Sequence, residues 1–191
     1  MIYTVERVGA TRLADRLIAE FGTSSSALSA SPDRLNRALP NATHVVELLL
    51  AARHLLLHSL GQEIQERPIL ADDRAVQQYL FAHMAYMPVE QARILHLDAK
   101  NRLMRDDVVA YGTVDRVSLT PRELVRQALD IGATGMILAH NHPSGDSTPS
   151  NSDMVITRAI FEAAKLFDIR LLDHIIVSRS GFYSFRAKGH L

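Results

Sequence analysis

The chain has no cysteine among its 191 residues. Disulfides and thiolate chemistry are therefore excluded, and so is the cysteine-based ligand set that structural zinc sites usually have. A chain without cysteine fits a reducing compartment, and we expect a cytoplasmic protein.

Net charge is also missing, because 21 basic residues face 21 acidic ones. Residues 1–67 balance as well, with seven of each sign. Proteins that bind duplex DNA usually show a basic excess or a basic stripe, and neither is visible. We expect at most weak, nonspecific DNA binding.

Long hydrophobic runs are absent too. No apolar run has transmembrane length, and no basic-then-apolar leader opens the sequence, so we expect no membrane association. The apolar content of 47% is ordinary for a globular protein and is enough for a core. This length allows one or two small domains.

The pattern of residues changes near 61–68, which predicts a helical domain over 1–67 and a second domain over 68–191. In the first domain a helix is expected over 10–21, and Ser31-Pro32-Asp33 has the cap chemistry of another helix start. Residues 23–26 are expected to be a polar link. The apolar run 45–60 predicts a buried helix that Gly61 could close.

The second domain mixes helices and strands. Thr120-Pro121-Arg122-Glu123 has the pattern of a capped helix start, with a Glu three residues after the cap. Helices are expected at 72–86, 121–131 and 151–167, and strands at 91–98, 102–111, 134–139, 169–178 and 182–185. This mixture predicts an α/β or α+β sheet with helices packed on it.

The most informative stretch is 140–153. If the apolar run 134–139 is a strand, His140 and His142 point the same way, because strand side chains alternate between faces. Asp153 lies where the next helix begins. Two imidazoles and one carboxylate make the three-ligand set of a catalytic zinc site, with a fourth position left for water.

Simpler interpretations exist for each part. Ser150 and Asp153 have nearly the spacing and chemistry of a capping box, with Asp in place of the usual Glu or Gln. A His-x-His at a strand end is often only a polar terminus. The joint pattern is much more specific than either part.

This joint pattern, His-x-His-Pro followed after six residues by Ser-x-x-Asp, resembles the JAMM (MPN-plus) metalloprotease motif. The full sequence of residues 140–153 resembles the RadC family in particular. So do Pro121-Arg122-Glu123 and two later segments, 173–177 and 183–185, and the resemblance covers about 67–191. It implies a deaminase-like α-β-α JAMM/MPN domain, here preceded by a small all-helical domain.

The resemblance also implies roles. His140, His142 and Asp153 would hold Zn²⁺, Glu90 would be the general base, and Ser150 would stabilise an oxyanion. Without the resemblance, Glu90 is a solvent-exposed carboxylate at a strand start. Other carboxylates are weaker candidates for the base: Asp106, Asp107 and Glu123.

Several neighbouring residues stay open between function and structure. Asp146, Asp173 and His174 could orient a ligand imidazole or be structural. His54 and His58 have metal-binding spacing on a helix but lack the Glu of His-Glu-x-x-His, so we expect exposed side chains.

The resemblance further implies a helix-hairpin-helix-like segment in 1–67. The turn that would bind a DNA phosphate corresponds to residues 39–43, which contain no glycine. Three functions remain open. The protein could be a zinc hydrolase acting on a peptide or protein, a DNA-associated repair or recombination factor, or an interaction module with a structural metal. A homodimer is possible.

The charge balance generates a prediction about DNA. We expect only weak binding to duplex, branched or single-stranded DNA at about 150 mM salt, because strong binding draws on many Lys and Arg contacts to phosphate. Titrations of labelled DNA across salt concentrations measure this. Submicromolar affinity with a steep salt slope would place the repair-factor interpretation first.

Overall fold

The computed structural model describes residues 7–69, 73–112 and 119–191. The chain forms two compact units, divided between His58 and Ser59. This division falls inside the long helix α4 (Thr43–Glu66), ahead of the boundary expected at 67/68.

The N-terminal unit is helical. It comprises α1 (Arg7–Phe21), α2 (Ser24–Leu28), α3 (Pro32–Ala38) and the first part of α4. Its core is a cluster of buried side chains from these helices and their connections: Leu17, Ala27, Ala30, Leu35, Ala38, Leu39, Ala42 and Val46.

Side-chain caps set the starts of the two short helices. Ser31 accepts a hydrogen bond from the Arg34 N–H, so the predicted cap of α3 is confirmed. The polar link expected at 23–26 is wrong. Thr23 caps α2 by accepting from the Ser26 N–H, and the serines continue as helix.

The prediction of a buried helix closed by Gly61 is also wrong. Helix α4 runs through Gly61 to Glu66, and Leu48 and Leu55 are 60% and 68% exposed. Its apolar residues surround the helix instead of forming one stripe, so only some of them can pack. A single glycine lowers helix stability by about 1 kcal/mol but does not end a helix without capping contacts.

The C-terminal unit contains a mixed five-stranded sheet in the order β2-β1-β3-β4-β5. The strands are β1 (Gln91–Leu97), β2 (Leu103–Tyr111), β3 (Gly135–Asn141), β4 (Arg170–Ser178) and β5 (Gly181–Ser184). Only β3 and β4 pair in parallel, and the other neighbours are antiparallel.

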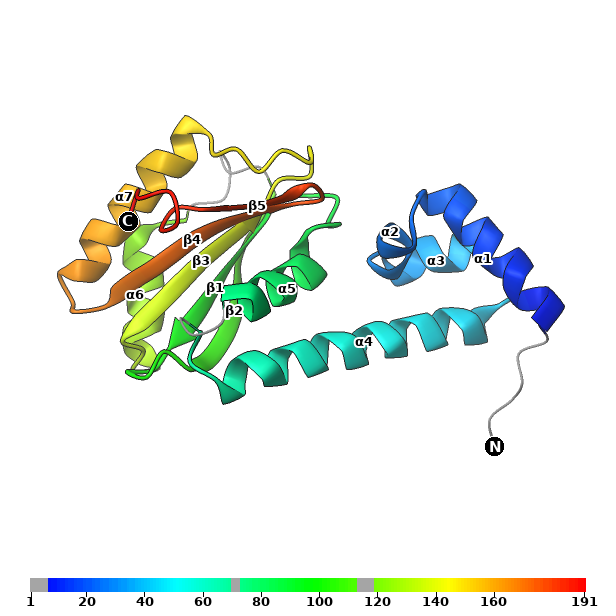
Figure 1. Ribbon diagram of the computed structural model, residues 1–191, viewed down its shortest axis with the longest axis horizontal. Coiled ribbons are helices and arrows are strands. Elements are labelled where there is room, and N and C mark those ends of the chain that lie inside the picture. The colour runs from blue at the N-terminus through cyan, green and yellow to red at the C-terminus, as the bar shows by residue number, and fades with distance from the viewer. Residues whose placement is uncertain (1–6, 70–72, 113–118) are drawn as a thin grey trace. The chain divides into compact units, whose positions relative to one another are not determined.

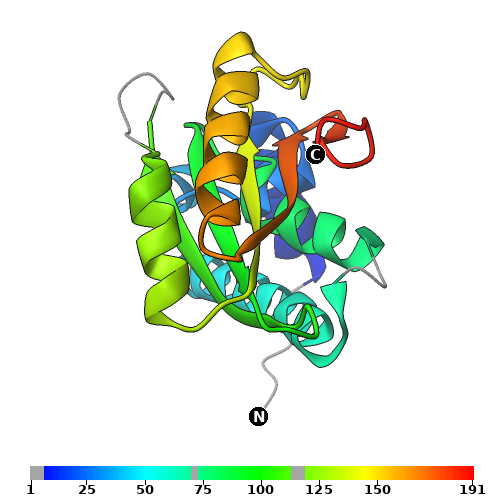
Figure 2. The same cartoon turned by 90° about the vertical axis from the view of Figure 1, so that its left-hand side faces the viewer.

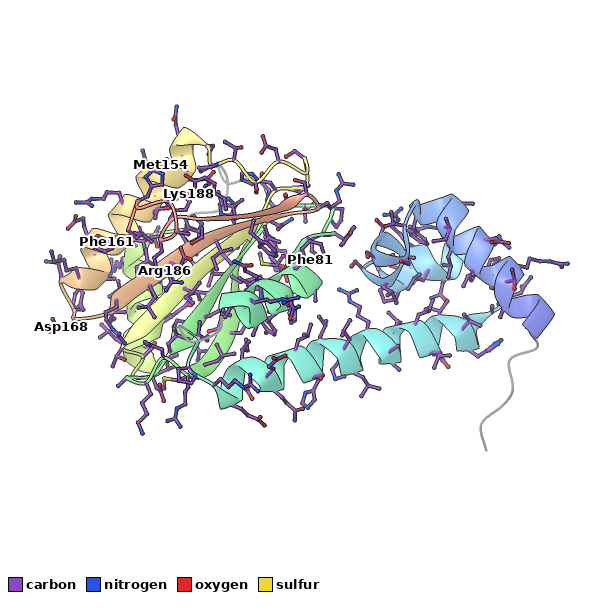
Figure 3. The ribbon with its side chains drawn as sticks, viewed as in Figure 1. Phe81, Met154, Phe161, Asp168, Arg186 and Lys188 are labelled. Carbon is purple, nitrogen blue, oxygen red and sulfur yellow. The ribbon has the colours of Figure 1, made fainter. Side chains whose placement is uncertain are left out.

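Helices cover both faces of this sheet (Figures 1 and 2). Helix α5 (Asp73–Met84) packs on one face, and α6 (Pro121–Asp130) and α7 (Asn151–Lys165) pack together on the other. Figure 3 labels Phe81 of α5 and Phe161 of α7, which belong to the cores on opposite faces. The predicted α+β class and α-β-α layering are confirmed.

One predicted capping box is absent. Thr120 has extended backbone before α6, but its side chain makes no capping hydrogen bond. Glu123 instead pairs with Arg126 one turn further along the helix. The proline at the first position is sufficient to start the helix here, because its φ is already helical.

Strand β3 is buried on both faces. Its side chains alternate between the two faces, and this alternation sets the direction of the His140 side chain. Ile137 and Ala139 contribute to the core beneath α5, whereas Met136 and Leu138 contribute to the core beneath α6 and α7. His140 continues the second set and therefore faces α7.

The connection from β3 to β4 brings α7 to the same place. Because these strands are parallel, the chain must cross back over the sheet, and it does so through α7. The N-terminus of α7 therefore lies near the carboxyl end of β3, the edge where α/β sheets usually bind ligands.

None of the helices in the described ranges is both long enough and apolar enough to cross a membrane.

The packing of α5 yields a stability prediction. Leu80→Ala should lower the free energy of unfolding by about 2–5 kcal/mol, because Leu80 is fully buried against the sheet. Urea unfolding followed by circular dichroism measures the change. The matched control is Leu55→Ala on exposed α4, which should change stability by less than about 0.5 kcal/mol. Equal effects of the two substitutions would contradict this packing.

Candidate metal centre

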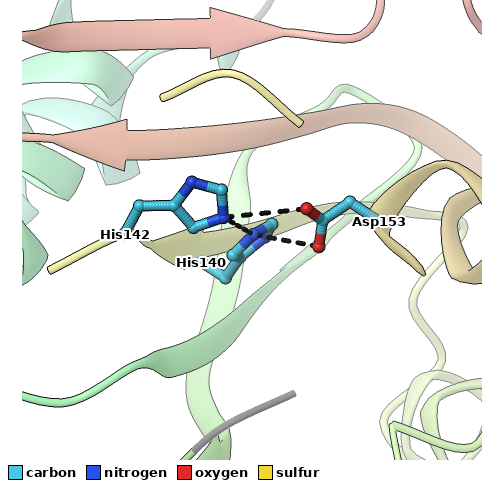
Figure 4. A group of neighbouring side chains, drawn as sticks. All are labelled: His140, His142 and Asp153. Atoms are coloured by element: carbon cyan, nitrogen blue, oxygen red, sulfur yellow. Dashed lines mark hydrogen bonds and ion pairs between the residues drawn. The ribbon is translucent and has the colours of Figure 1, made fainter. Parts of the chain in front are cut away.

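Three side chains from β3, its following turn and α7 converge at the carboxyl end of β3 (Figure 4). The Nε2 atoms of His140 and His142 are 3.0 Å apart. His140 Nε2 lies 3.2 Å from Asp153 Oδ1, and His142 Nε2 lies 3.6 Å from Asp153 Oδ2. Their donor atoms all lie within 4.8 Å of one another, and the structure thus brings together the three residues that the motif predicted.

The strand and turn fix both histidines. The strand expected to end at residue 139 continues to Asn141, so His140 is held within the sheet, and the His142 N–H donates to the Val177 carbonyl at 2.9 Å. The chain then turns through Gly145, whose φ of +93° is accessible mainly to glycine.

Asp146 orients the second imidazole through its backbone. His142 Nδ1 lies 2.8 Å from the Asp146 carbonyl oxygen, which can only accept, so Nδ1 carries the proton. The other nitrogen, Nε2, is left to face the cluster. The Asp146 carboxylate accepts from the Thr148 N–H.

Ser150 and Asp153 form the capping box of α7, and the same carboxylate faces the histidines. Ser150 Oγ accepts from the Asp153 N–H at 3.2 Å, and the Ser150 N–H donates to Asp153 Oδ2 at 2.7 Å. The Ser150 hydroxyl also donates to Oδ2 at 2.7 Å. The helix-cap and metal-ligand interpretations of this motif are therefore compatible, because the cap fixes the Asp153 carboxylate.

A chain of hydrogen bonds orients the other imidazole. His140 Nδ1 lies 2.8 Å from His174 Nε2, and His174 Nδ1 lies 2.5 Å from Thr157 Oγ1. The Thr157 hydroxyl donates to the Asp153 carbonyl at 2.5 Å. Since that hydroxyl donates to the carbonyl, it accepts from His174 Nδ1–H, and His174 Nε2 in turn accepts from His140 Nδ1–H.

This direction leaves His140 Nε2 without a proton and free to bind a cation. This chain of hydrogen bonds requires His174 to be neutral, and burial lowers the pKa of His174 well below its ordinary value. The Phe185 ring stacks on His174 with centroids 4.7 Å apart. Sequence reasoning missed Thr157, for which the only signal is its place one turn after Asp153.

Asp173 belongs to another part of the unit. Its carboxylate accepts hydrogen bonds from the Ser184 hydroxyl at 2.6 Å and from the N–H groups of His174 and Arg186 at 2.8 and 2.9 Å. Burial raises the pKa of Asp173. These contacts fasten the C-terminal segment to β4 and touch neither of the clustered histidine rings.

The weaker candidates for a base lie away from the cluster. Asp106 pairs with Arg93, Asp107 with Arg105, and Glu123 with Arg126. The remaining helical pair, His54 and His58, is exposed on α4, as expected.

Glu90 lies directly before β1 and is half-buried. It lines a small cleft together with His140, Asp153 and His174. The other walls are mostly apolar, from Ala92, Ala110, Leu119 and Ile156. The predicted base and two of the three predicted ligands, His140 and Asp153, thus border one cleft.

Electrostatics prepare the cluster for a cation. Burial by itself raises the pKa of Asp153, but interactions with His140, His142 and Ser150 outweigh it and hold that pKa well below its usual range. The hydrogen bond to Asp153 raises the pKa of His142. The site therefore stabilises positive charge, which a proton on His142 or a metal ion can supply.

The donor set fits a divalent metal such as zinc. Two imidazole nitrogens and one carboxylate oxygen are the usual ligands of an open zinc site, and each ring is oriented by a hydrogen bond at its other nitrogen. Within the described ranges, this is the group of histidine and acidic residues whose spacing suits a metal ion.

The comparisons with known proteins agree with this geometry. A family model described as the RadC-like JAB domain matches residues 70–190. A protein of Rhodobacter capsulatus named UPF0758 protein is 40% identical over 179 residues, which is 94% of this chain and 84% of that protein. The chain belongs to the RadC-like JAB domain family, and the resemblance predicted from the motif is confirmed.

The hydrogen-bond chain predicts an effect on metal affinity. His174→Ala should weaken zinc binding by about 10–100-fold, because His140 then loses the acceptor that sets its tautomer and orientation. Competition with a chromophoric chelator measures the affinity. His54→Ala removes an exposed histidine and should leave zinc binding unchanged. Unaltered zinc affinity in His174→Ala would show that the hydrogen-bond chain does not support the metal site.

Proposed function

We propose that the protein is a zinc-dependent hydrolase that cleaves a peptide or isopeptide bond in a peptide or protein substrate. The observation that carries this proposal is the placement of Glu90 on the same cleft as His140 and Asp153, two of the three clustered candidate ligands. Zinc, when bound, lowers the pKa of a coordinated water toward about 7 and polarises a substrate carbonyl.

In this proposal Glu90 supplies general acid–base catalysis. Its carboxylate accepts the proton of the attacking water and passes it to the leaving amine. Its half-buried place on an apolar-walled cleft supports this role, since partial exclusion of water strengthens charge interactions. His140, His142 and Asp153 act as ligands and take no proton in this cycle.

Ser150 is proposed to donate a hydrogen bond to the developing oxyanion. Its hydroxyl donates to Asp153 Oδ2. The Ser150 N–H donates to the same oxygen, so the carboxylate would keep a partner if the hydroxyl turned toward a substrate.

The three-ligand set favours catalysis over a purely structural metal. Structural zinc sites close the coordination sphere with four protein ligands. Here a fourth His or acidic ligand is missing from the cluster among the described residues, and the cleft opens beside it. An interaction module with a structural metal would have no need of Glu90 in that cleft.

Glu90→Gln tests the proposed base. The variant should keep about one zinc per chain, because Glu90 acts through water and not on the ion, and it should lose cleavage by about 10²–10⁴-fold. Cleavage by the zinc-loaded protein is measured with two substrate libraries, one of fluorogenic peptides and one of lysine-isopeptides. Metal content is measured by elemental analysis.

The matched control is Glu123→Gln, which removes an exposed carboxylate on α6 and should leave cleavage unchanged. Loss of zinc in Glu90→Gln would make Glu90 a ligand. Full activity would place the base elsewhere. Absence of any chelator-sensitive cleavage in the wild type against both libraries would overturn the hydrolase proposal.

A further inference from the structure

Asn141 stands between the two candidate ligands in sequence, yet its side chain makes contacts outside the cluster. It is fully buried at the end of β3. Its Oδ1 accepts from the Gln91 N–H at 2.8 Å, and its Nδ2 donates to the Val89 carbonyl at 3.1 Å. One partner can only donate and the other can only accept, so the orientation of the amide is fixed.

These two backbone partners are the neighbours of Glu90 on either side. The ladder between β1 and β3 ends at the pair Ala92 and His140. The Asn141 amide extends this ladder beyond its last pair, in the place where another peptide group would pair. From the β2 side, the Gly112 N–H donates to the Glu90 carbonyl at 2.8 Å.

Glu90 lies outside regular secondary structure, so these three hydrogen bonds replace the constraint that a strand would provide. A general base must lie within about 2.6–3.2 Å of the atom it deprotonates, and an error of about 1 Å can cost 10²-fold in rate. A fixed link from the ligand-bearing strand to the base-bearing segment meets this requirement.

We infer that Asn141 is a positioning residue that holds the Val89–Gln91 backbone and so places the Glu90 carboxylate at the metal cluster. This inference rests on the proposed function, because it takes Glu90 as the base. Asn141, the residue between the two histidines, would thereby link the strand that carries the ligands to the segment that carries the base.

The competing explanation is that the Asn141 amide only stabilises the fold. Both explanations expect a loss of stability when the amide is removed, because two backbone groups lose their partners. They differ in whether the Glu90 carboxylate loses its influence on the metal site.

The experiment uses the full-length protein loaded with Co²⁺, whose visible absorption reports the metal environment. Asn141→Leu removes both hydrogen bonds at similar volume, and Asn141→Asp keeps the acceptor for Gln91 but loses the donor to Val89. Glu90→Gln is the reference variant. Tyr79→Phe is the control, since it deletes a core hydrogen bond to Asp106 on β2 without touching the Glu90 segment.

Three quantities are measured: cobalt affinity by chelator competition, the pH midpoint of the cobalt spectrum, and hydrogen exchange of the Gln91 amide by NMR. Glu90→Gln should shift the midpoint by about one pH unit, because a nearby carboxylate is lost. Asn141→Leu should shift it in the same direction with cobalt affinity within about threefold of the wild type, and should speed Gln91 exchange at least about tenfold. Asn141→Asp should protect Gln91 and give a smaller shift.

The double variant Glu90→Gln, Asn141→Leu should shift no further than Glu90→Gln, because the carboxylate through which Asn141 acts is already gone. Tyr79→Phe should lower stability and leave the midpoint unchanged. A pH midpoint equal to that of the wild type in both Asn141 variants, or unchanged Gln91 exchange in Asn141→Leu, would overturn the positioning role of Asn141. Either result would leave Glu90 as the proposed base. An unchanged midpoint in Glu90→Gln would instead remove the proposed base, and the positioning role with it.

Discussion

The parallel pairing of β3 with β4 is the constraint on which the candidate site depends. It obliges the chain to leave the carboxyl end of β3 and return over the sheet through α7. His140 and His142 therefore stand where the strand ends, and Asp153 stands where the helix begins. The capping box then fixes the carboxylate, so a local rule for starting a helix also sets the third corner of the cluster.

The two strands contribute in a second way, through side chains that face the same layer. His174 on β4 lies beside His140 on β3, and Thr157 on α7 closes the path back to the Asp153 backbone. Each member of this path is buried and has a partner, which avoids the cost of an unpaired polar group. Orientation of the imidazole and stability of the layer thus come from the same hydrogen bonds.

Much of this could be predicted from sequence because it depends on short-range patterns. Alternation in the buried strands, the proline at the start of α6 and the spacing from His140 to Asp153 are all local. The roles of Asn141 and Thr157 could not be predicted in this way, because they depend on which backbone groups and rings lie opposite them after folding. The exposure of α4 was mispredicted because apolar content was taken for burial, although burial also needs a partner surface.

The hydrogen bonds and ion pairs among His140, His142 and Asp153 have a consequence for how the protein acquires a metal. The pair with Asp153 raises the pKa of His142, and a protonated imidazole cannot bind a metal ion. The apolar cores on the two faces of the sheet contain none of these three residues, unlike small zinc domains, whose folding depends on the metal. A proton and a metal ion would therefore compete for His142, so that acidity as well as local metal supply would govern how much of the protein carries a metal.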